Sequence, residues 1–313
     1  AQRAATVKDQ TGTVMAGKAI TWASSDAAIV SVSSVGLVTA ISPGTANITA
    51  THLTLSATAS VIVQDAIAPG NDPNFTIVAH SDAGFTSTNR KVEVLGVPIY
   101  AYANVEDVKL LHAANIMAQY LDNDEDGVVD NPALLSALIS SNAALYMWKQ
   151  EGQQGSINAQ DLGADESVPA WHNNGHTSRF DAALEEIWHV ITHSGFANAY
   201  PDAFGEDAGT SLTNAMDIAR GGRFQSVPRP YPGGAWYTYD DQTCDYGCMA
   251  TEYIYWAMTS VLGAQENRSG EIQQEWKLNT KAKVQQMDTA IYQLLTDPQY
   301  VFPIVLPDGT YRR

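Results

Sequence analysis

The sequence predicts a protein of two domains: an all-β sandwich over residues 1–64 and an α+β domain over residues 75–313. Residues 1–64 are rich in Ala, Val, Thr and Ser, in short alternating runs separated by turn residues, which is typical of small β-sandwiches. The remainder combines strand-like runs with helical periodicity. Between the two, residues 65–74 (DAIAPGNDPN) contain Pro and Gly without periodicity, so we expect a linker there.

The features that mark the first domain lie mostly within residues 20–51: Trp22, Ser24, Ser25, Asp26, Val30, Val32, Gly36, Leu37, Val38, Pro43, Gly44 and Thr45. Gly36 and Gly44 suit turns, and the alternating apolar residues suit a core between two sheets. This stretch resembles the bacterial Ig-like group 2 family, whose members are spacers or adhesive modules. The resemblance implies a secreted or cell-surface bacterial protein.

In the second domain, we expect strands over 74–80, 91–102 and 143–148, helices over 105–120, 180–193, 249–262 and 271–296, and a Gly/Pro-rich segment that ends near Cys248. The composition restricts the partners. Acidic residues outnumber basic ones, 34 to 17, and the formal net charge of -17 repels nucleic acid. Because no run of 18 apolar residues exists, we expect no transmembrane segment.

The helix predicted over 180–193 (FDAALEEIWHVITH) has the strongest functional pattern. Its apolar stripe consists of Phe180, Leu184, Ile187 and Ile191. Its opposite side gathers Glu185, Glu186, His189 and His193. Carboxylates and imidazoles on one helical face are ligands of transition metals. A solvated face would explain the carboxylates, but it explains poorly why four of the seven His lie between residues 172 and 193.

The order Glu185-Glu186-Ile187-Trp188-His189 resembles the HExxH motif of zincin metallopeptidases, with Glu in place of the first His. The resemblance implies a zincin-like α+β fold, with Glu186 as the general base and a third ligand on a later helix. Glu252 is the expected ligand, because an unpaired carboxylate within the apolar segment 249–263 is costly to bury. A salt bridge to Arg220 or Arg223 is the alternative.

Two ligand sets remain open. The first is Glu185, His189 and Glu252, and the second pairs His189 with His193, at i,i+4, and adds Glu252. Zinc is the expected metal, with manganese or iron as alternatives, because carboxylates accept all three. In many zincins, a Tyr or His near the third ligand stabilises the oxyanion. Tyr239 is the expected residue here, and Tyr237 and Tyr246 are alternatives.

Residues 122–130 (DNDEDGVVD) match the EF-hand loop at positions 1, 3, 5, 6 and 9. We therefore expect calcium to be bound by the following carboxylates: Asp122, Asp124, Asp126 and Asp130. Gly127 stands at the sharp turn. Position 12 is Ala133 instead of the usual Glu, so another part of the chain would have to donate a ligand. A solvated acidic turn is the alternative.

Only two Cys are present, Cys244 and Cys248, and we expect a local disulfide, with a reduced pair as the alternative. The expected function is a secreted zincin-like metallohydrolase, most simply a peptidase, that uses a metal-activated water on a protein or peptide. A cell-surface glycan is a further candidate partner. The alternative is a non-catalytic surface binding or adhesion protein with an inactive zincin-derived domain. Glycoside cleavage ranks lower, because Glu185 and Glu186 point about 100° apart and cannot flank a glycosidic bond.

Overall fold

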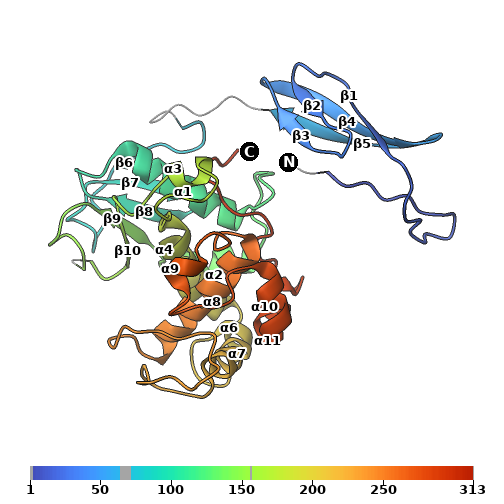
Figure 1. The fold of residues 1–313 in the computed structure, drawn as a ribbon. Coiled ribbons are helices and arrows are strands. Elements are labelled where there is room, and N and C mark those ends of the chain that lie inside the picture. The colour runs from blue at the N-terminus through green and yellow to red at the C-terminus, as the bar shows by residue number, and fades with distance from the viewer. Residues whose placement is uncertain (1–2, 64–71, 156, 313) are drawn as a thin grey trace. The chain divides into compact units, whose positions relative to one another are not determined.

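The computed structural model describes residues 3–63, 72–155 and 157–312. Contacts divide the chain into two compact units, Ala1–Ala68 and Pro69–Arg313 (Figure 1). The predicted linker over 65–74 lies mostly outside the described residues. Its described end belongs to the second unit, because the Asp72 carboxylate accepts a hydrogen bond from the side-chain amide of Asn115 (2.6 Å).

The first unit is all-β. Its larger sheet has the antiparallel order β1-β4-β5, and β2 pairs with β3 in a second ladder. The strands are β1 (Thr21–Ser24), β2 (Val30–Val32), β3 (Val38–Ala40), β4 (Gly44–His52) and β5 (Leu55–Val63). A small core contains Val30, Val38, Ala46 and Ile48, with Trp22 packed against it. Gly36 is required at its turn, because a Cβ there would lie 2.6 Å from the Arg3 carbonyl oxygen.

The second unit contains one five-stranded mixed sheet of order β10-β9-β8-β7-β6. The strands are β6 (Val78–Ala79), β7 (Arg90–Val94), β8 (Val97–Ala101), β9 (Leu145–Trp148) and β10 (Gln160–Gly163). The run predicted as one strand over 91–102 is a hairpin. Leu95 and Gly96 form its two-residue loop. Their φ angles are 52° and 92°, the positive values that such turns require.

Helices cover this sheet and build the rest of the unit (Figure 1). They are α1 (Asp107–Leu121), α2 (Pro132–Ser140), α3 (Ala170–Asn173), α4 (Ala183–His189), the π-helix η1 (Val190–Phe196), α5 (Ala197–Ala199), α6 (Pro201–Phe204), α7 (Ser211–Arg220), α8 (Tyr246–Leu262), α9 (Ser269–Ile272), α10 (Lys281–Met287) and α11 (Thr289–Thr296). Helix α1 packs on β7, β8 and α4, while α8 packs against α4, α7, α10 and α11. Among the described residues, no helix is both long and apolar enough to cross a membrane.

Two predictions about the helices were wrong. The helix expected over 271–296 is divided into α9, α10 and α11. It breaks because Trp276 is fully buried, with its indole N–H bonded to Ser260 Oγ at 2.9 Å, and because Thr280 caps a new helix. The Gly/Pro-rich segment before Cys248 also contains two helices that were not predicted, α6 and α7. The helix expected over 180–193 is α-helical only to His189 and then widens into η1.

Candidate metal centre

The packing of α4 against α8 brings Glu185, His189 and Glu252 together. One potential ligand atom from each residue lies within 4.8 Å of the others. His189 Nε2 is 3.7 Å from Glu252 Oε2, and these two side chains are only 8% and 13% exposed. The spacing resembles that of ligands around one ion more than that of direct hydrogen bonds, which are 2.7–3.2 Å long.

The carboxylates and the imidazole perturb one another strongly. Burial and the charges of Glu252 and Glu186 raise the pKa of Glu185 to about 8. Burial alone would lower the pKa of His189, but Glu252 and its two acidic neighbours on α4 raise it to about 10. Burial also raises the pKa of Glu252. In the absence of a cation, the cluster therefore holds protons at neutral pH, and a divalent cation would displace them.

The orientation of His189 leaves one ring nitrogen for a ligand. Its Nδ1 faces Glu186 Oε2 at 3.6 Å, and the Tyr255 ring packs edge-on against the imidazole with the centroids 5.7 Å apart. Its Nε2 is buried and has no hydrogen-bond partner. Metal-binding His residues direct one nitrogen to the ion and the other to a carboxylate or carbonyl. The donor set and this orphaned nitrogen fit a transition metal.

Glu186 lies beside the cluster. Its Oε2 accepts a hydrogen bond from the side-chain amide of Gln160 on β10. Gln160 lines the cavity that opens onto the cluster, whereas Glu186 is not among the lining residues. The carboxylate is thus held within reach of both His189 and the cavity wall.

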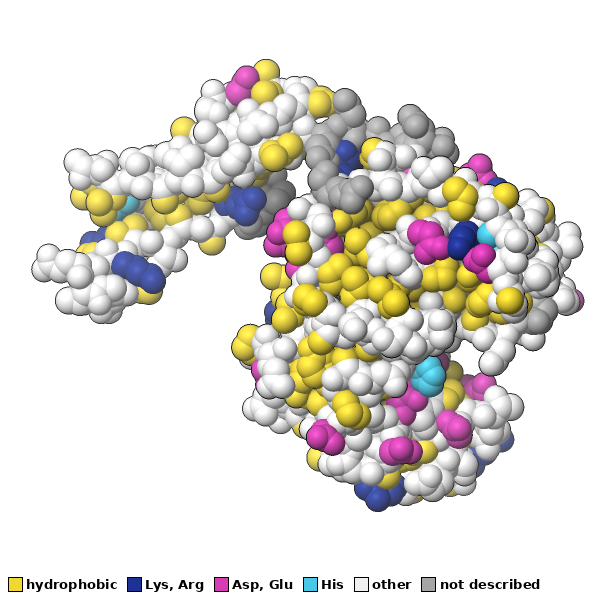
Figure 2. All heavy atoms as spheres, turned by 180° about the vertical axis from the view of Figure 1, so that it is seen from behind, with side chains coloured by type: hydrophobic (Ala, Val, Ile, Leu, Met, Phe, Trp, Pro, Cys, Tyr) yellow, Lys and Arg dark blue, Asp and Glu magenta, His cyan; other side chains and the backbone are white. Residues whose placement is uncertain are grey.

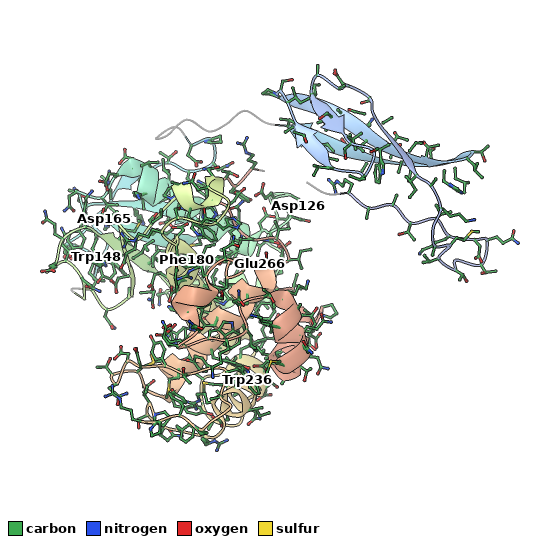
Figure 3. All side chains as sticks on the ribbon, in the orientation of Figure 1. Asp126, Trp148, Asp165, Phe180, Trp236 and Glu266 are labelled. Carbon is green, nitrogen blue, oxygen red and sulfur yellow. A yellow bond between two sulfur atoms is a disulfide. The ribbon has the colours of Figure 1, made fainter. Side chains whose placement is uncertain are left out.

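Of the three candidate tyrosines, the structure places Tyr239 at the cluster. Its hydroxyl donates to Glu252 Oε1 at 3.2 Å, and burial together with the charge of Glu252 raises its pKa, so it remains a donor. Tyr237 donates to the Met249 carbonyl oxygen at 2.7 Å instead, and Tyr246 donates to a carboxylate on α7. The neighbouring Trp236, labelled in Figure 3, is likewise committed, since its indole donates to Asp288.

His193 lies outside the cluster, so the alternative ligand pair of His189 and His193 is not formed. The residues after His189 follow the wider i→i+5 pattern of η1, which moves His193 out of α-helical register. Its side chain is 66% exposed, and its Nδ1 is 2.8 Å from Glu206. The turn is tightly packed, because a Cβ at Gly195 would lie 2.5 Å from Leu134 Cδ1 of α2.

The alternative ion pair for Glu252 is also absent from the described residues. Arg220 and Arg223 both pair with Asp217, at 2.9 Å and 3.1 Å. Arg220 is fully buried and also contacts Met249 Sδ. Both guanidinium groups therefore compensate a carboxylate on α7 and leave Glu252 to the cluster.

A cavity of about 810 Å³ opens onto the candidate metal centre. Its lining comes from α4, η1, β10, the loops after α6 and α7, and the first half of α8: Gln160, His189, His193, Glu206, Asp207, Ala208, Gln225, Asp245, Tyr246, Gly247, Cys248, Thr251 and Glu252. A cavity of this size can accept a substrate of several residues.

The loop between α1 and α2 brings Asp122, Asp124 and Asp130 within 4.8 Å of one another. Asp122 is fully buried, and its Oδ2 accepts from the Gly127 amide at 2.8 Å. Asp126, labelled in Figure 3, lies outside this trio, with its Oδ1 accepting from the Val128 amide. Burial and the neighbouring carboxylates raise the pKa of Asp130.

The C-terminal segment is bonded to the same loop. The Tyr311 hydroxyl donates to Asp122 Oδ2, and the side-chain oxygen of Asn123 accepts from the amides of Ile304 and Val305. The loop therefore ties the end of the chain to α1 and α2, which gives it a structural role.

The structure also contains a cluster that the sequence pattern did not reveal. Asp181 is fully buried, and its Oδ2 lies 2.7 Å from His112 Nε2 and 2.8 Å from His172 Nε2. Burial alone would raise the pKa of Asp181, but the two imidazoles hold it well below its usual range. Asp181 Oδ1 accepts from the Val168 amide. Both carboxylate oxygens are thus satisfied, and His172 Nδ1 lacks the partner that a metal-binding His normally has.

Cys244 and Cys248 are bonded as a disulfide, which links the loop before α8 to the first turn of that helix. No curated protein and no solved structure matches the chain. Residues 1–63 match the model of the bacterial Ig-like domain (group 2), a domain typical of bacterial surface or extracellular proteins.

Proposed function

We propose that the second unit is a zincin-like metallohydrolase, most simply a metallopeptidase, and that the Ig-like unit holds it near a cell surface. One observation carries this proposal: Glu185, His189 and Glu252 converge in a buried cluster that opens onto a large cavity. The helix that bears the first two residues packs against β10, the edge strand of a mixed sheet. This arrangement supports the zincin-like interpretation of the motif.

The charge of the cluster supports a divalent cation. The carboxylates of Glu185, Glu252 and the nearby Glu186 repel one another, and all three are partly or fully shielded from water. No Lys or Arg of the described chain pairs with them. A donor set of one imidazole and two carboxylates suits zinc, and it also suits manganese or iron. Bound there, a metal ion would polarise a substrate carbonyl and lower the pKa of water at the open position.

The surrounding residues have separate roles. Glu186 would accept the proton of the water that attacks the substrate, and its contact with Nδ1 orients His189. Gln160 holds Glu186 in place. Tyr239 donates from the side of Glu252 and would stabilise the negative charge that develops on the substrate oxygen.

We further propose that calcium binds the loop of Asp122, Asp124 and Asp130, with Asp126 as a more distant ligand. The burial of Asp122 and the convergence of three carboxylates support this. The ion would stabilise the junction of α1, α2 and the C-terminal segment and would take no part in hydrolysis.

The test is hydrolysis of unfolded protein and peptide mixtures, followed by mass spectrometry. The chain is first stripped with a chelator and then reloaded with zinc, manganese or iron, with calcium present throughout. We expect turnover only after reloading. Glu186→Gln should retain the metal and lose at least about a hundredfold in turnover, because general-base catalysis contributes 10²–10⁴-fold.

His189→Ala should lose both metal and activity, while His52→Ala, in the Ig-like unit, should match the wild type. If Glu186→Gln loses metal affinity as well as turnover, orientation of His189 is its main role. If no metal restores activity and none binds, the proposal fails and a non-catalytic surface binding protein becomes the better interpretation.

A further inference from the structure

We propose that the cavity beside the metal centre selects a substrate with a basic side chain, a Lys or Arg close to the bond that is cleaved. This inference rests on the proposed metallopeptidase function and names its substrate class. The feature that carries it is the one-sided charge of the cavity wall. Besides the candidate metal ligands, the carboxylates of the lining are Glu206, Asp207 and Asp245. His193 pairs with Glu206, and no described Lys or Arg lines the cavity.

Glu206 is fixed at a defined position in this wall. Its carboxylate lies 2.8 Å from His193 Nδ1 and accepts a hydrogen bond from Thr251 Oγ1 at 3.0 Å. His193, which contacts Glu206, lines the same cavity as His189. A substrate bound at His189 therefore shares this cavity with the Glu206 carboxylate.

Asp207 and Asp245 are the other two carboxylates of the acidic wall. Both are exposed, and neither forms an ion pair with a Lys or Arg of the described chain. Asp245 Oδ1 caps the first turn of α8 by accepting from the Cys248 amide at 2.9 Å. The disulfide brackets Asp245 and holds that turn together, so this carboxylate too has a fixed place.

The buried His189 Nε2, which lines the cavity and has no partner in the protein, also points to a ligand bound there. On the face that Figure 2 shows, several acidic side chains lie near an exposed histidine of the second unit. A concave acidic wall raises the local concentration of cationic groups, and its long-range part weakens with added salt. An acidic or purely apolar side chain would gain nothing from these carboxylates.

The experiment uses the full chain loaded with zinc and calcium. The substrates are peptides that differ at one residue, which is Lys, Arg, Leu or Glu, on either side of a common cleavage site. We expect kcat/KM for Lys and Arg to exceed that for Leu by about tenfold, because each exposed ion pair contributes roughly a two- to fivefold effect. The preference should shrink as salt rises.

Glu206→Gln/Asp207→Asn should reduce the ratio of basic to Leu substrates severalfold, while Glu151→Gln, on an exposed loop of the same unit, should leave the ratio unchanged. Cleavage without a basic preference, or a preference that the double variant retains, would overturn the inference and leave the metallohydrolase proposal intact.

If no peptide is cleaved, the proposed hydrolysis fails, and binding decides the inference instead. The probe is the Lys peptide, added to the zinc-loaded chain and measured by calorimetry against the Glu peptide. Tighter binding of the Lys peptide that is lost in the double variant would support the acidic wall as a cation site. Equal binding would overturn it.

Discussion

Metal binding should release protons, and their number follows from the electrostatics of the cluster. The pKa of Glu185 is raised to about 8 and that of His189 to about 10, so we expect both side chains to hold a proton at pH 7 before metal binds. Binding of one zinc ion at that pH should therefore release about two protons.

The sign of the pH dependence follows. Both pKa values are raised above pH 7, so protons compete with the metal below these values, and affinity must rise as the pH rises towards 8. Between pH 7 and pH 6, zinc affinity should fall about a hundredfold, since about two protons are exchanged. Glu185→Gln removes one titrating group and should reduce the release at pH 7 from about two protons to about one.

Isothermal titration calorimetry in buffers of different ionisation enthalpy measures this number directly. Calcium is added first, so that zinc does not titrate the loop of Asp122. His189→Ala should abolish the zinc heat, and His52→Ala should reproduce the wild type. If zinc binds the wild type with the same heat in every buffer, the ligands are already deprotonated in the folded protein, and the electrostatic reasoning is refuted.

Three further predictions concern stability and domain organisation. Asp181→Ala leaves two buried imidazoles without their acceptor and should cost about 3–5 kcal/mol of unfolding free energy at pH 7. Because the pKa of Asp181 is lowered in the folded protein, this stabilisation is present above about pH 4 and is lost below it. The melting curves of the variant and the wild type should therefore converge in acid. Calcium at a hundredfold excess over its Kd should add about 2.7 kcal/mol to the free energy of unfolding and raise Tm by about 5–10 °C. Asp124→Ala should remove this increase, whereas the exposed Asp202→Ala should keep it. If EGTA leaves the Tm of the wild type unchanged, the loop is a plain acidic turn without calcium. A 75–313 fragment should retain activity on small peptides, since no residue of the first unit belongs to the candidate site; loss of activity in a fragment that circular dichroism shows to be folded would contradict this.

The sequence predicted the parts of the fold that depend on local pattern. The Ig-like unit was identified from its turns and alternating residues, and the helix over 105–120 is α1, Asp107–Leu121. The convergence of Glu185, His189 and Glu252 was also expected, because one turn of helix separates the first two and an acidic residue within an apolar helix needs compensation.

What the sequence did not predict depends on contacts between distant segments. The change from α4 to η1 separates His193 from His189, and it accompanies the close approach of α2 to Gly195, which no local pattern reveals. The cluster of His112, His172 and Asp181 joins residues up to 69 positions apart. Trp276 breaks the last predicted helix through its contact with Ser260.

The most direct test of the metal centre is an anomalous difference map from crystals of the zinc-loaded full chain, recorded on both sides of the zinc absorption edge. We predict a peak about 2.0–2.1 Å from His189 Nε2, with carboxylate oxygens of Glu185 and Glu252 at about 2.0–2.2 Å. A map without a peak there, or with a zinc peak only between His112 and His172, would contradict the proposal that these three residues form the metal centre.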